Sequence, residues 1–311
     1  MVSDAPLRYS KKCRSLCSES QDISFEMRRL GKLVPWYGPK IARKVGNGTG
    51  PRTVQWLDFS PASTSSPILS PMRFIVVDTA DARGSIAILD ERELLAIEEH
   101  TGEEDYSIWL LPAVRRVLAR SSLSLAELDG YAVCAGPGSF TGLRVGLTTV
   151  KAWAEIYGKP IASLSRLEAF AVSSPEPESA LVASYSDARR DQVFAALYAR
   201  GGSGYESLAG ESVISLPDFV AAVREKSAGQ PVRWVTPDPA LLESGASWAA
   251  LLAAGHILQA TPPPFAPLLG VLACRKFRQG RTTDALSLDA NYVRRSDAEM
   301  LWKGNKSAFK A

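Results

Sequence analysis

The stretch AGPGSFTGLRVGL, residues 135–147, places four glycines within thirteen residues and narrows the choice of fold more than any other segment. Three of these glycines, Gly138, Gly142 and Gly146, are spaced four residues apart, and Val150 continues the row. The stretch follows a predicted strand and opens a predicted helix. Such an arrangement is compatible with a phosphate-binding loop, with a nucleophile turn, or with a helix surface left bare for close packing.

Two of these interpretations meet obstacles in the residues themselves. A Walker-type phosphate loop needs a lysine directly after its second glycine, whereas none follows here until Lys151. The dinucleotide spacing G-x-G-x-x-G would need a glycine where Thr141 stands, although free backbone N–H groups at the helix start could still hold an anion. A serine nucleophile requires G-x-S-x-G and a histidine base. Ser139 directly follows a glycine, and His100 and His256 fit loop or strand-edge positions, so hydrolysis is disfavoured.

The third interpretation, a bare helix surface, agrees with the spacing. Residues four apart form one ridge along a helix, and glycine removes the side chain that keeps a second backbone at a distance. A glycine inside a helix costs roughly 0.5–1 kcal/mol relative to alanine, so two of them require a compensating gain. That gain is close packing either on the protein's own sheet or on a partner helix, and the spacing alone favours neither.

Outward from this stretch, the pattern of apolar residues predicts two successive α/β halves. The first half reads as strands at 73–78, 84–90 and 93–99, a helix at about 105–121 and a strand at 130–136. The glycine-led helix then runs to about residue 157, followed by a strand at 160–165 and a helix at 166–173. After a boundary at 174–179, the second half reads as a strand hairpin at 180–200, a helix at 216–226, a strand at 232–236 and a helix at 267–280. Both halves begin with strands and continue with alternating helices and strands, which indicates a duplicated α/β plan.

Composition indicates about two domains preceded by a segment of a different kind. The 311 residues are 46% hydrophobic and 22% charged, with no apolar run near the ~18 residues of a membrane span and no secretory leader. Residues 1–71 contain 11 Lys and Arg against 5 Asp and Glu, whereas the rest contains 25 against 28 and has no overall basic excess for nucleic acid. Because the first segment also lacks apolar periodicity, we expect it to be disordered, with Met72 as a candidate true start of translation.

The cysteines point to a reduced, cytosolic protein. Cys134 and Cys274 lie alone in apolar stretches, which favours buried thiols over a disulfide framework. Cys13 and Cys17 have no second pair of Cys or His nearby, so no metal site is expected there.

Four stretches, taken together, resemble the TsaB (YeaZ-like) family. They are, in order, FIVVDTA (74–80), GPGSFTGLRVGLTTVKAWA (136–154), SDARRDQVFAALY (186–198) and YVRRSDAEMLWK (292–303). The resemblance covers about residues 72–311, and GPGSFTGLR is its most specific motif. This family supplies the non-catalytic subunit of the bacterial machinery that makes threonylcarbamoyladenosine in tRNA.

The resemblance implies an actin-like fold (ASKHA, RNase H-like) made of two related α/β subdomains, at 72–177 and 178–311. It also implies a heterodimer with the metal-dependent paralogue TsaD, which carries out the transfer, an association with the ATPase TsaE, and tRNA as a partner through the complex. In the family, the glycine-led helix packs against TsaD, and the helix at 105–121 is the second contributor. The expected interface residues are Gly138, Ser139, Phe140, Gly142, Leu143, Arg144, Gly146 and Val150.

The residues that are missing agree with a non-catalytic role. The catalytic paralogue holds its metal through a His-x-x-x-His pair, which this sequence lacks, so we expect neither a metal nor a catalytic residue in this chain. Asp78 matches the aspartate that opens the first phosphate hairpin of the actin-like fold, and Asp78 and Thr79 are candidates for a weak nucleotide contact. The hairpin lacks its early glycine, so we expect ATP to be used by the complex and not hydrolysed by this chain. A turn carboxylate at a strand end explains Asp78 equally well.

Other functions stay open at this point, as do several departures from the family pattern. The alternatives are an independent M22-like peptidase or ATP-dependent phosphotransferase, and a homodimeric regulator. A histidine that is frequent in the first helix region is replaced around residues 103–107. Gln192 and Phe194 stand where the family commonly has glutamate and tyrosine, and Ala290 replaces a proline, whereas Tyr292 and Arg294 match.

Overall fold

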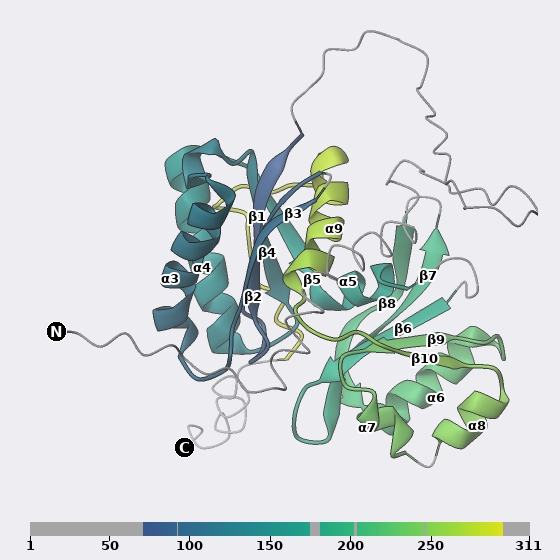
Figure 1. The fold of residues 1–311 in the computed structure, drawn as a ribbon. Helices are drawn as coiled ribbons and strands as arrows, with labels where there is room; N and C mark the ends of the chain where they lie inside the picture. The colour runs from purple at the N-terminus through teal and green to yellow at the C-terminus, as the bar shows by residue number, and fades with distance from the viewer. Residues whose placement is uncertain (1–70, 92, 175–180, 202–203, 246, 295–311) are drawn as a thin grey trace, which may run out of the picture. The chain divides into compact units, whose positions relative to one another are not determined.

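The computed structural model describes residues 71–91, 93–174, 181–201, 204–245 and 247–294 (Figure 1). Met1–Pro71 and Met72–Ala311 form separate units, and the fold described below belongs to the second. The predicted disorder of residues 1–71 and the cysteines at positions 13 and 17 lie outside the described residues. The same holds for most of the predicted boundary at 174–179, so the proposed limits of the two subdomains stay predictions.

The first half of the second unit is built on a five-stranded mixed sheet in the order β3-β2-β1-β4-β5. Its strands are β1 (Arg73–Asp78), β2 (Ser85–Asp90), β3 (Leu94–Glu99), β4 (Gly130–Gly136) and β5 (Ile161–Ser165). The first three strands pair antiparallel, and β1, β4 and β5 pair parallel. The central strands are buried on both faces, which is why they read as continuous apolar runs and not as alternating ones.

The second half repeats this plan. Its strands are β6 (Leu181–Asp187), β7 (Gln192–Gly201), β8 (Gly204–Ser215), β9 (Arg233–Thr236) and β10 (Ile257–Ala260). Read from the far edge, the order is β8-β7-β6-β9-β10, with the same antiparallel and parallel pairings as in the first sheet. The predicted duplicated, actin-like α/β fold is therefore confirmed. The predicted pattern omitted the strands β8 and β10. Both are edge strands whose described side chains are exposed or half-buried, so neither carries a continuous apolar run.

Helices cover both sheets in layers (Figure 1). α3 (Tyr106–Ser121) packs on β2 and β3, and α4 (Phe140–Tyr157) packs on β1 and β4, so the two helices lie side by side on one face of the first sheet. α9 (Ala266–Arg278) packs on β1, β2, β4 and β5, from the opposite face of the sheet (Figure 1). α5 (Arg166–Val172) contacts strands of both sheets. The second sheet is covered by α6 (Leu216–Ser227), with α7 (Ala240–Glu243) and α8 (Trp248–Ala253) beside it, and a short 3-10 helix at Leu125–Glu127 precedes β4.

The ends of α4 follow from local sequence. The side chain of Ser139 accepts a hydrogen bond from Gly142 N, which is the usual role of a serine at a helix N-cap. Gly158 ends the helix in the left-handed region, at φ 62°, where glycine carries no steric penalty. These two residues fix the glycine-rich stretch as the first turns of a helix that begins at the end of β4.

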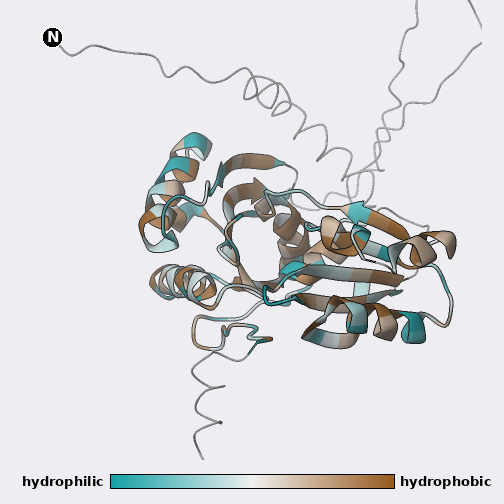
Figure 2. Ribbon diagram, turned by 90° about the horizontal axis from the view of Figure 1, so that it is seen from below, coloured by the Kyte–Doolittle hydropathy of each residue, from teal (hydrophilic) through white to brown (hydrophobic). Residues whose placement is uncertain are grey.

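Apolar side chains form the interior of each half. Figure 2 shows hydrophobic residues following the strands, whereas hydrophilic residues recur along the helices. In the second half, Trp234 is fully buried and its ring lies 5.6 Å from that of Phe219 and 6.4 Å from that of Tyr185. Cys134 is buried, as expected, and Cys274 is half-buried. Among the described residues, no helix combines the length and the apolar character that crossing a membrane requires.

Candidate functional site

A pocket of about 320 Å³ lies at the junction of the two halves. It is bounded by the turn after β1, the loop between β4 and α4, the start of α5, the turn between β6 and β7, and the segment 291–294. Because these segments are distant in sequence, the pocket exists only in the folded chain. Its charged lining residues are Asp81, Arg166, Asp187, Arg189, Arg190 and Arg294.

The buried side of the pocket is closed by ion pairs to Arg166, the first residue of α5. Its Nη2 lies 2.7 Å from Asp78 Oδ2, and its Nη1 lies 2.6 Å from Asp81 Oδ2. The side chains of Arg166 and Asp78 are 2% and 0% exposed. Burial raises the pKa of Asp78, although Arg166 acts in the opposite direction. For Asp81, the effect of burial is outweighed by Arg166 and Arg83, which lower its pKa to about 2.

The turn after β1 is held from two directions. The hydroxyl of Tyr106, at the start of α3, donates a hydrogen bond to the backbone oxygen of Asp81. Arg83 Nη1 lies 2.8 Å from Asp238 Oδ1 in the second half. The other carboxylate oxygen of Asp238 accepts from Asp187 N at 2.9 Å, next to the turn between β6 and β7. The turn after β1 is therefore fixed both to α3 and to the second half.

The glycine ridge faces this same turn. A Cβ added to Gly138 would collide with the Ala80 backbone oxygen, and a Cβ added to Gly142 would collide with that of Thr79. At Gly146 the added Cβ would lie 2.5 Å from Thr79 Oγ1. The hydroxyl of Thr79 donates to the Gly142 carbonyl at 2.7 Å, which a bulkier residue would disturb. The ridge is bare because α4 lies directly against the end of β1.

The prediction that this ridge packs on a partner helix is therefore wrong for its glycines, and the alternative, packing on the protein's own sheet, is what the structure shows. Leu143 and Val150 are 1% and 0% exposed, so they too belong to the core of this chain. The physical reason is the position of these residues around the helix axis. Residues that form one ridge lie on the same side of the helix, and the side with the glycines faces the sheet. Of the expected interface residues, those exposed at the surface are Ser139, Phe140 and Arg144.

The two candidates for nucleotide contact are engaged inside the chain. Asp78 and Thr79 are fully buried. Asp78 pairs with Arg166 and accepts from Ala80 N at 3.1 Å, and the Thr79 hydroxyl is bonded to Gly142. The side chain that lines the pocket is Arg166, not either of these two.

Aromatic rings and an arginine form an exposed stack at one edge of the pocket. The rings of Phe140 and Tyr292 lie 4.8 Å apart at an interplanar angle of 35°. The guanidinium of Arg144 lies 3.7 Å from the centroid of the Phe140 ring, and its Nε donates to the Tyr292 hydroxyl at 3.1 Å. Phe140 and Tyr292 are 37% and 40% exposed, so ring surface is left accessible. We call Arg144, Phe140 and Tyr292 the rim stack.

Arg294 contacts Gln192 and Phe194, the two residues after the DAR motif that depart from the family pattern. Its Nη2 donates to Gln192 Oε1 at 2.7 Å, and its guanidinium lies 5.9 Å from the centroid of the Phe194 ring. Phe194 and Arg294 both line the pocket. The two departures after the DAR motif are thus gathered around one arginine, whose partners are a neutral amide and an aromatic ring.

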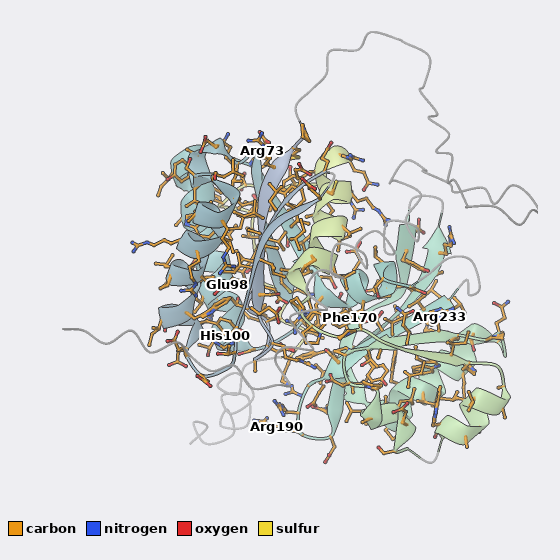
Figure 3. The ribbon with its side chains drawn as sticks, viewed as in Figure 1. Arg73, Glu98, His100, Phe170, Arg190 and Arg233 are labelled. Atoms are coloured by element: carbon orange, nitrogen blue, oxygen red, sulfur yellow. The ribbon has the colours of Figure 1, made fainter. Side chains whose placement is uncertain are left out.

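The turn between β6 and β7 has an unusual backbone. Arg189, Arg190 and Asp191 have φ angles of 63°, 57° and 55°, all in the left-handed region. Each such residue costs roughly 1–2 kcal/mol when it is not glycine. Figure 3 shows Arg190 at this turn, and both arginines are exposed. Strain of this kind is concentrated at functional sites, which makes the turn a candidate.

Neither histidine belongs to the pocket. His100 follows β3 and stacks on Tyr106 at 4.3 Å, and His256 lies in the loop before β10, as expected for loop and strand-edge residues. Within the described parts of the chain, no three His, Cys, Asp or Glu residues are grouped as a metal site would require.

Two charged residues at this junction were absent from the predicted site. Arg166 could have been noticed, because an arginine that opens the apolar helix RLEAFAV must find a partner if it is buried. Glu211 offered no such signal, because it lies on β8, a strand that the apolar pattern did not predict. Its carboxylate accepts hydrogen bonds from Ser165, Tyr198 and Asn291, and burial raises its pKa.

Comparison with known proteins agrees with this architecture. The family model described as TsaD, tRNA N6-adenosine threonylcarbamoyltransferase, matches residues 98–254, half of the chain. The tRNA threonylcarbamoyladenosine biosynthesis protein TsaB of Bacillus subtilis (strain 168) is 28% identical over 235 residues, which are 74% of this chain and 98% of that protein. TsaB of Escherichia coli (strain K12) is 27% identical over 238 residues, 75% of this chain and 97% of that protein.

Solved structures agree with the fold. YeaZ from Pseudomonas aeruginosa has a TM-score of 0.54 at 25% identity, over 71% of this chain and 99% of that one. A second Pseudomonas aeruginosa structure, of an uncharacterised protein with similarity to peptidase YeaZ, has a TM-score of 0.58 at 24% identity, over 72% and 100%. The chain therefore belongs to the TsaD family, as a TsaB/YeaZ-like member.

Proposed function

We propose that this chain is a non-catalytic subunit in the biosynthesis of threonylcarbamoyladenosine in tRNA, and that it binds and activates a TsaD-like catalytic paralogue. The observation that carries the proposal is coverage: this chain spans 98% and 97% of two TsaB proteins whose names state that biosynthesis. The same proposal includes association with a TsaE-like ATPase and tRNA as a partner through the complex. ATP is then used by the complex, and this chain holds no nucleotide catalytically.

The geometry of the pocket supports a binding role over independent catalysis. The aspartate that an actin-like kinase or ATPase would present to its nucleotide is paired here with a buried arginine. Removing that arginine from Asp78 would leave a buried, uncompensated charge, which costs about 3–5 kcal/mol. The ion pair thus favours the closed arrangement, and the peptidase and phosphotransferase alternatives gain no support from the pocket.

The outer surface of α3 and α4 is the docking face that we propose for the TsaD-like partner. Both helices cover one face of the first sheet, so their remaining sides point away from it. On α3, Ile108 and Leu111 are 62% and 54% exposed, and on α4 Ile156 is 71% exposed. On α4 this side carries an exposed row four residues apart: Arg144, Thr148, Ala152 and Ile156. Exposed large apolar side chains on neighbouring helices are typical of protein interfaces.

The proposed contact row begins at Arg144, two residues after Gly142 of the predicted glycine row, and therefore lies on a different side of the helix. Successive residues of an α-helix differ by about 100°, so Arg144 points roughly 200° away from Gly142. The glycine row contacts β1, and the row that begins at Arg144 faces solvent. We therefore keep the helix of the partner-helix prediction and propose the contact on its opposite side.

The experiment that tests this proposal combines two charge substitutions on the docking face. Leu111→Glu together with Ile156→Glu should weaken binding to the purified TsaD-like paralogue of the same organism by at least tenfold, because two carboxylates would be buried without partners. Isothermal calorimetry measures the affinity, and modification of an unmodified tRNA transcript, reconstituted with and without this chain, measures the function.

The matched control is Leu252→Glu on α8, where the leucine is 58% exposed on the second half. It introduces the same charge on the same residue type and should leave the affinity unchanged. Equal affinity of the double variant and the natural sequence would overturn the docking face. Full tRNA modification in the absence of this chain would overturn the proposed function itself.

A further inference from the structure

We propose that the pocket and its rim stack bind a single-stranded segment of RNA, with a phosphate on the arginines of the β6–β7 turn and Arg294, and a base on Phe140 and Tyr292. The inference deepens the proposed function, on which it rests, by assigning to this chain a direct contact with the tRNA. The arginines that line the pocket and the exposed rings at its edge support this assignment.

The charge of the lining favours an anion. Four arginines and two aspartates line the pocket. Asp81 is engaged by Arg166 and Arg83, and Asp187 accepts from Arg189 N at 2.7 Å, with Arg189 Nη1 3.6 Å from its other oxygen. Arg294 donates to a neutral amide. Among the described residues that line the pocket, arginines therefore outnumber carboxylates.

The rim supplies the second half of RNA recognition. Bases of single-stranded RNA stack on aromatic side chains and on guanidinium planes, whatever the base, and a basic surface follows the backbone. Phe140 and Tyr292 offer half-exposed rings, and Arg144 already stacks on Phe140. Stacking surface and arginines therefore border the same pocket, on segments that the fold brings together from residues 140, 190 and 292.

The exposure of these groups favours a polymer over a free nucleotide. A mononucleotide site usually encloses most of its ligand. Here the Arg189 side chain is 84% exposed, and the rings are more than one-third exposed, whereas the deep side is closed by Arg166. An open rim of this kind suits a strand that enters and leaves the site.

The strained turn is consistent with this use. Three consecutive residues in the left-handed region hold two adjacent arginines at the edge of the pocket. Glycine would adopt this conformation without a steric penalty, whereas arginine does not. Phosphate binding is a property that arginine supplies through its planar array of donors.

The test measures fluorescence anisotropy with the full chain and two labelled probes, an unmodified tRNA transcript and a 12-nucleotide single-stranded RNA. Arg189→Gln and Tyr292→Leu change exposed side chains, so folding should be preserved, and circular dichroism checks it. Each variant should weaken binding of both probes by about fivefold or more. Arg189→Gln should also lower the slope of log affinity against log salt by about 0.7, the value for one phosphate contact on a single strand.

The matched control is Arg224→Gln on α6, an exposed arginine outside the pocket, which should leave both affinities unchanged. Unchanged RNA binding in Arg189→Gln and Tyr292→Leu would overturn the proposal. Displacement of the RNA probes by AMP or by inorganic phosphate at equal concentration would also overturn the proposal, because it would indicate a site for small anions. Affinity for the TsaD-like paralogue is measured on the same variants, so that its retention separates failure of this site from failure of the proposed function.

Discussion

At Gly142 and Gly146 the backbone of α4 approaches the end of β1 so closely that a methyl group has no room. A helix interior normally favours alanine over glycine by roughly 0.8–1 kcal/mol. Here the neighbours are the carbonyl and hydroxyl of Thr79, which are fixed by the central strand of the first sheet. At these residues the close contact with β1 therefore outweighs helix propensity. The lower helix propensity of glycine is the cost of packing the helix against the sheet.

The prediction at this scale is that Gly146→Ala lowers the melting temperature of the isolated chain. The cost of overpacking is typically 1–3 kcal/mol and exceeds the gain in helix propensity, so a net loss of up to about 2 kcal/mol is expected. Thermal denaturation followed by circular dichroism measures it. Thr148→Ala, on the exposed side of the same helix, is the control and should shift stability by no more than about 0.5 kcal/mol. An unchanged or higher melting temperature for Gly146→Ala would show that β1 can move away.

At the scale of elements, one histidine adds to the pairing of β9 with β10. His256, 6% exposed, lies just before β10, and its Nδ1 accepts from Val232 N at 3.1 Å and from Trp234 Nε1 at 3.3 Å. An acceptor at Nδ1 requires the neutral ring. Burial lowers the pKa of His256 accordingly. The histidine thus holds the start of β9 and its largest buried ring to the segment before β10.

This arrangement predicts a pH-dependent contribution to folding. Because the pKa of His256 is lower in the folded state than the usual 6.5, its contribution is complete above about pH 6.5 and is lost as the pH falls through the folded-state value. His256→Leu should remove about 1–3 kcal/mol at pH 8, since two buried donors lose their acceptor. Urea unfolding of both proteins at pH 8 and pH 5 measures the difference, which should shrink at pH 5. A difference that is equal at the two pH values would assign the effect to packing and not to the ring nitrogen.

At the scale of the whole molecule, the two halves are connected by polar contacts around the pocket. Arg83 pairs with Asp238, and Glu211 joins Ser165 and Asn291 to the second sheet. The apolar cores of both halves lie within Met72–Ala311, which forms one contact unit. The apolar cores that the structure describes are therefore formed by residues of this unit.

A chain that begins at Met72 should accordingly fold and bind the TsaD-like paralogue as the full chain does. We expect its melting temperature to lie within about 4 °C of the full chain, which corresponds to less than roughly 1 kcal/mol. Affinity for the paralogue should agree within tenfold. A chain that begins at Asp81 lacks the central strand β1 and should fail to fold, which makes it the control. A larger loss in the Met72 chain would mean that residues 1–71 contribute to the fold or to binding.

Local patterns in the sequence were sufficient to predict most of the strands and helices of this protein. The apolar runs of β1 and β4, the end of the glycine-led helix near residue 157, and the repetition of strands and helices could be predicted because each depends on neighbours within a few residues. The family followed from motifs of the same local kind. Edge strands such as β8 were not predicted, because strands with little burial carry a weak apolar pattern.

Only the tertiary structure decided what those elements contact. Periodicity shows that one side of α4 is special, but it does not name the neighbour, and the glycine row turned to β1 while the row from Arg144 to Ile156 turned to solvent. Asp78 and Arg166 are 88 residues apart, so the ion pair that closes the pocket has no signature in either segment. The physical reason is that burial and pairing are properties of the assembled chain, whereas sequence patterns report only the preference of a residue for being buried or exposed.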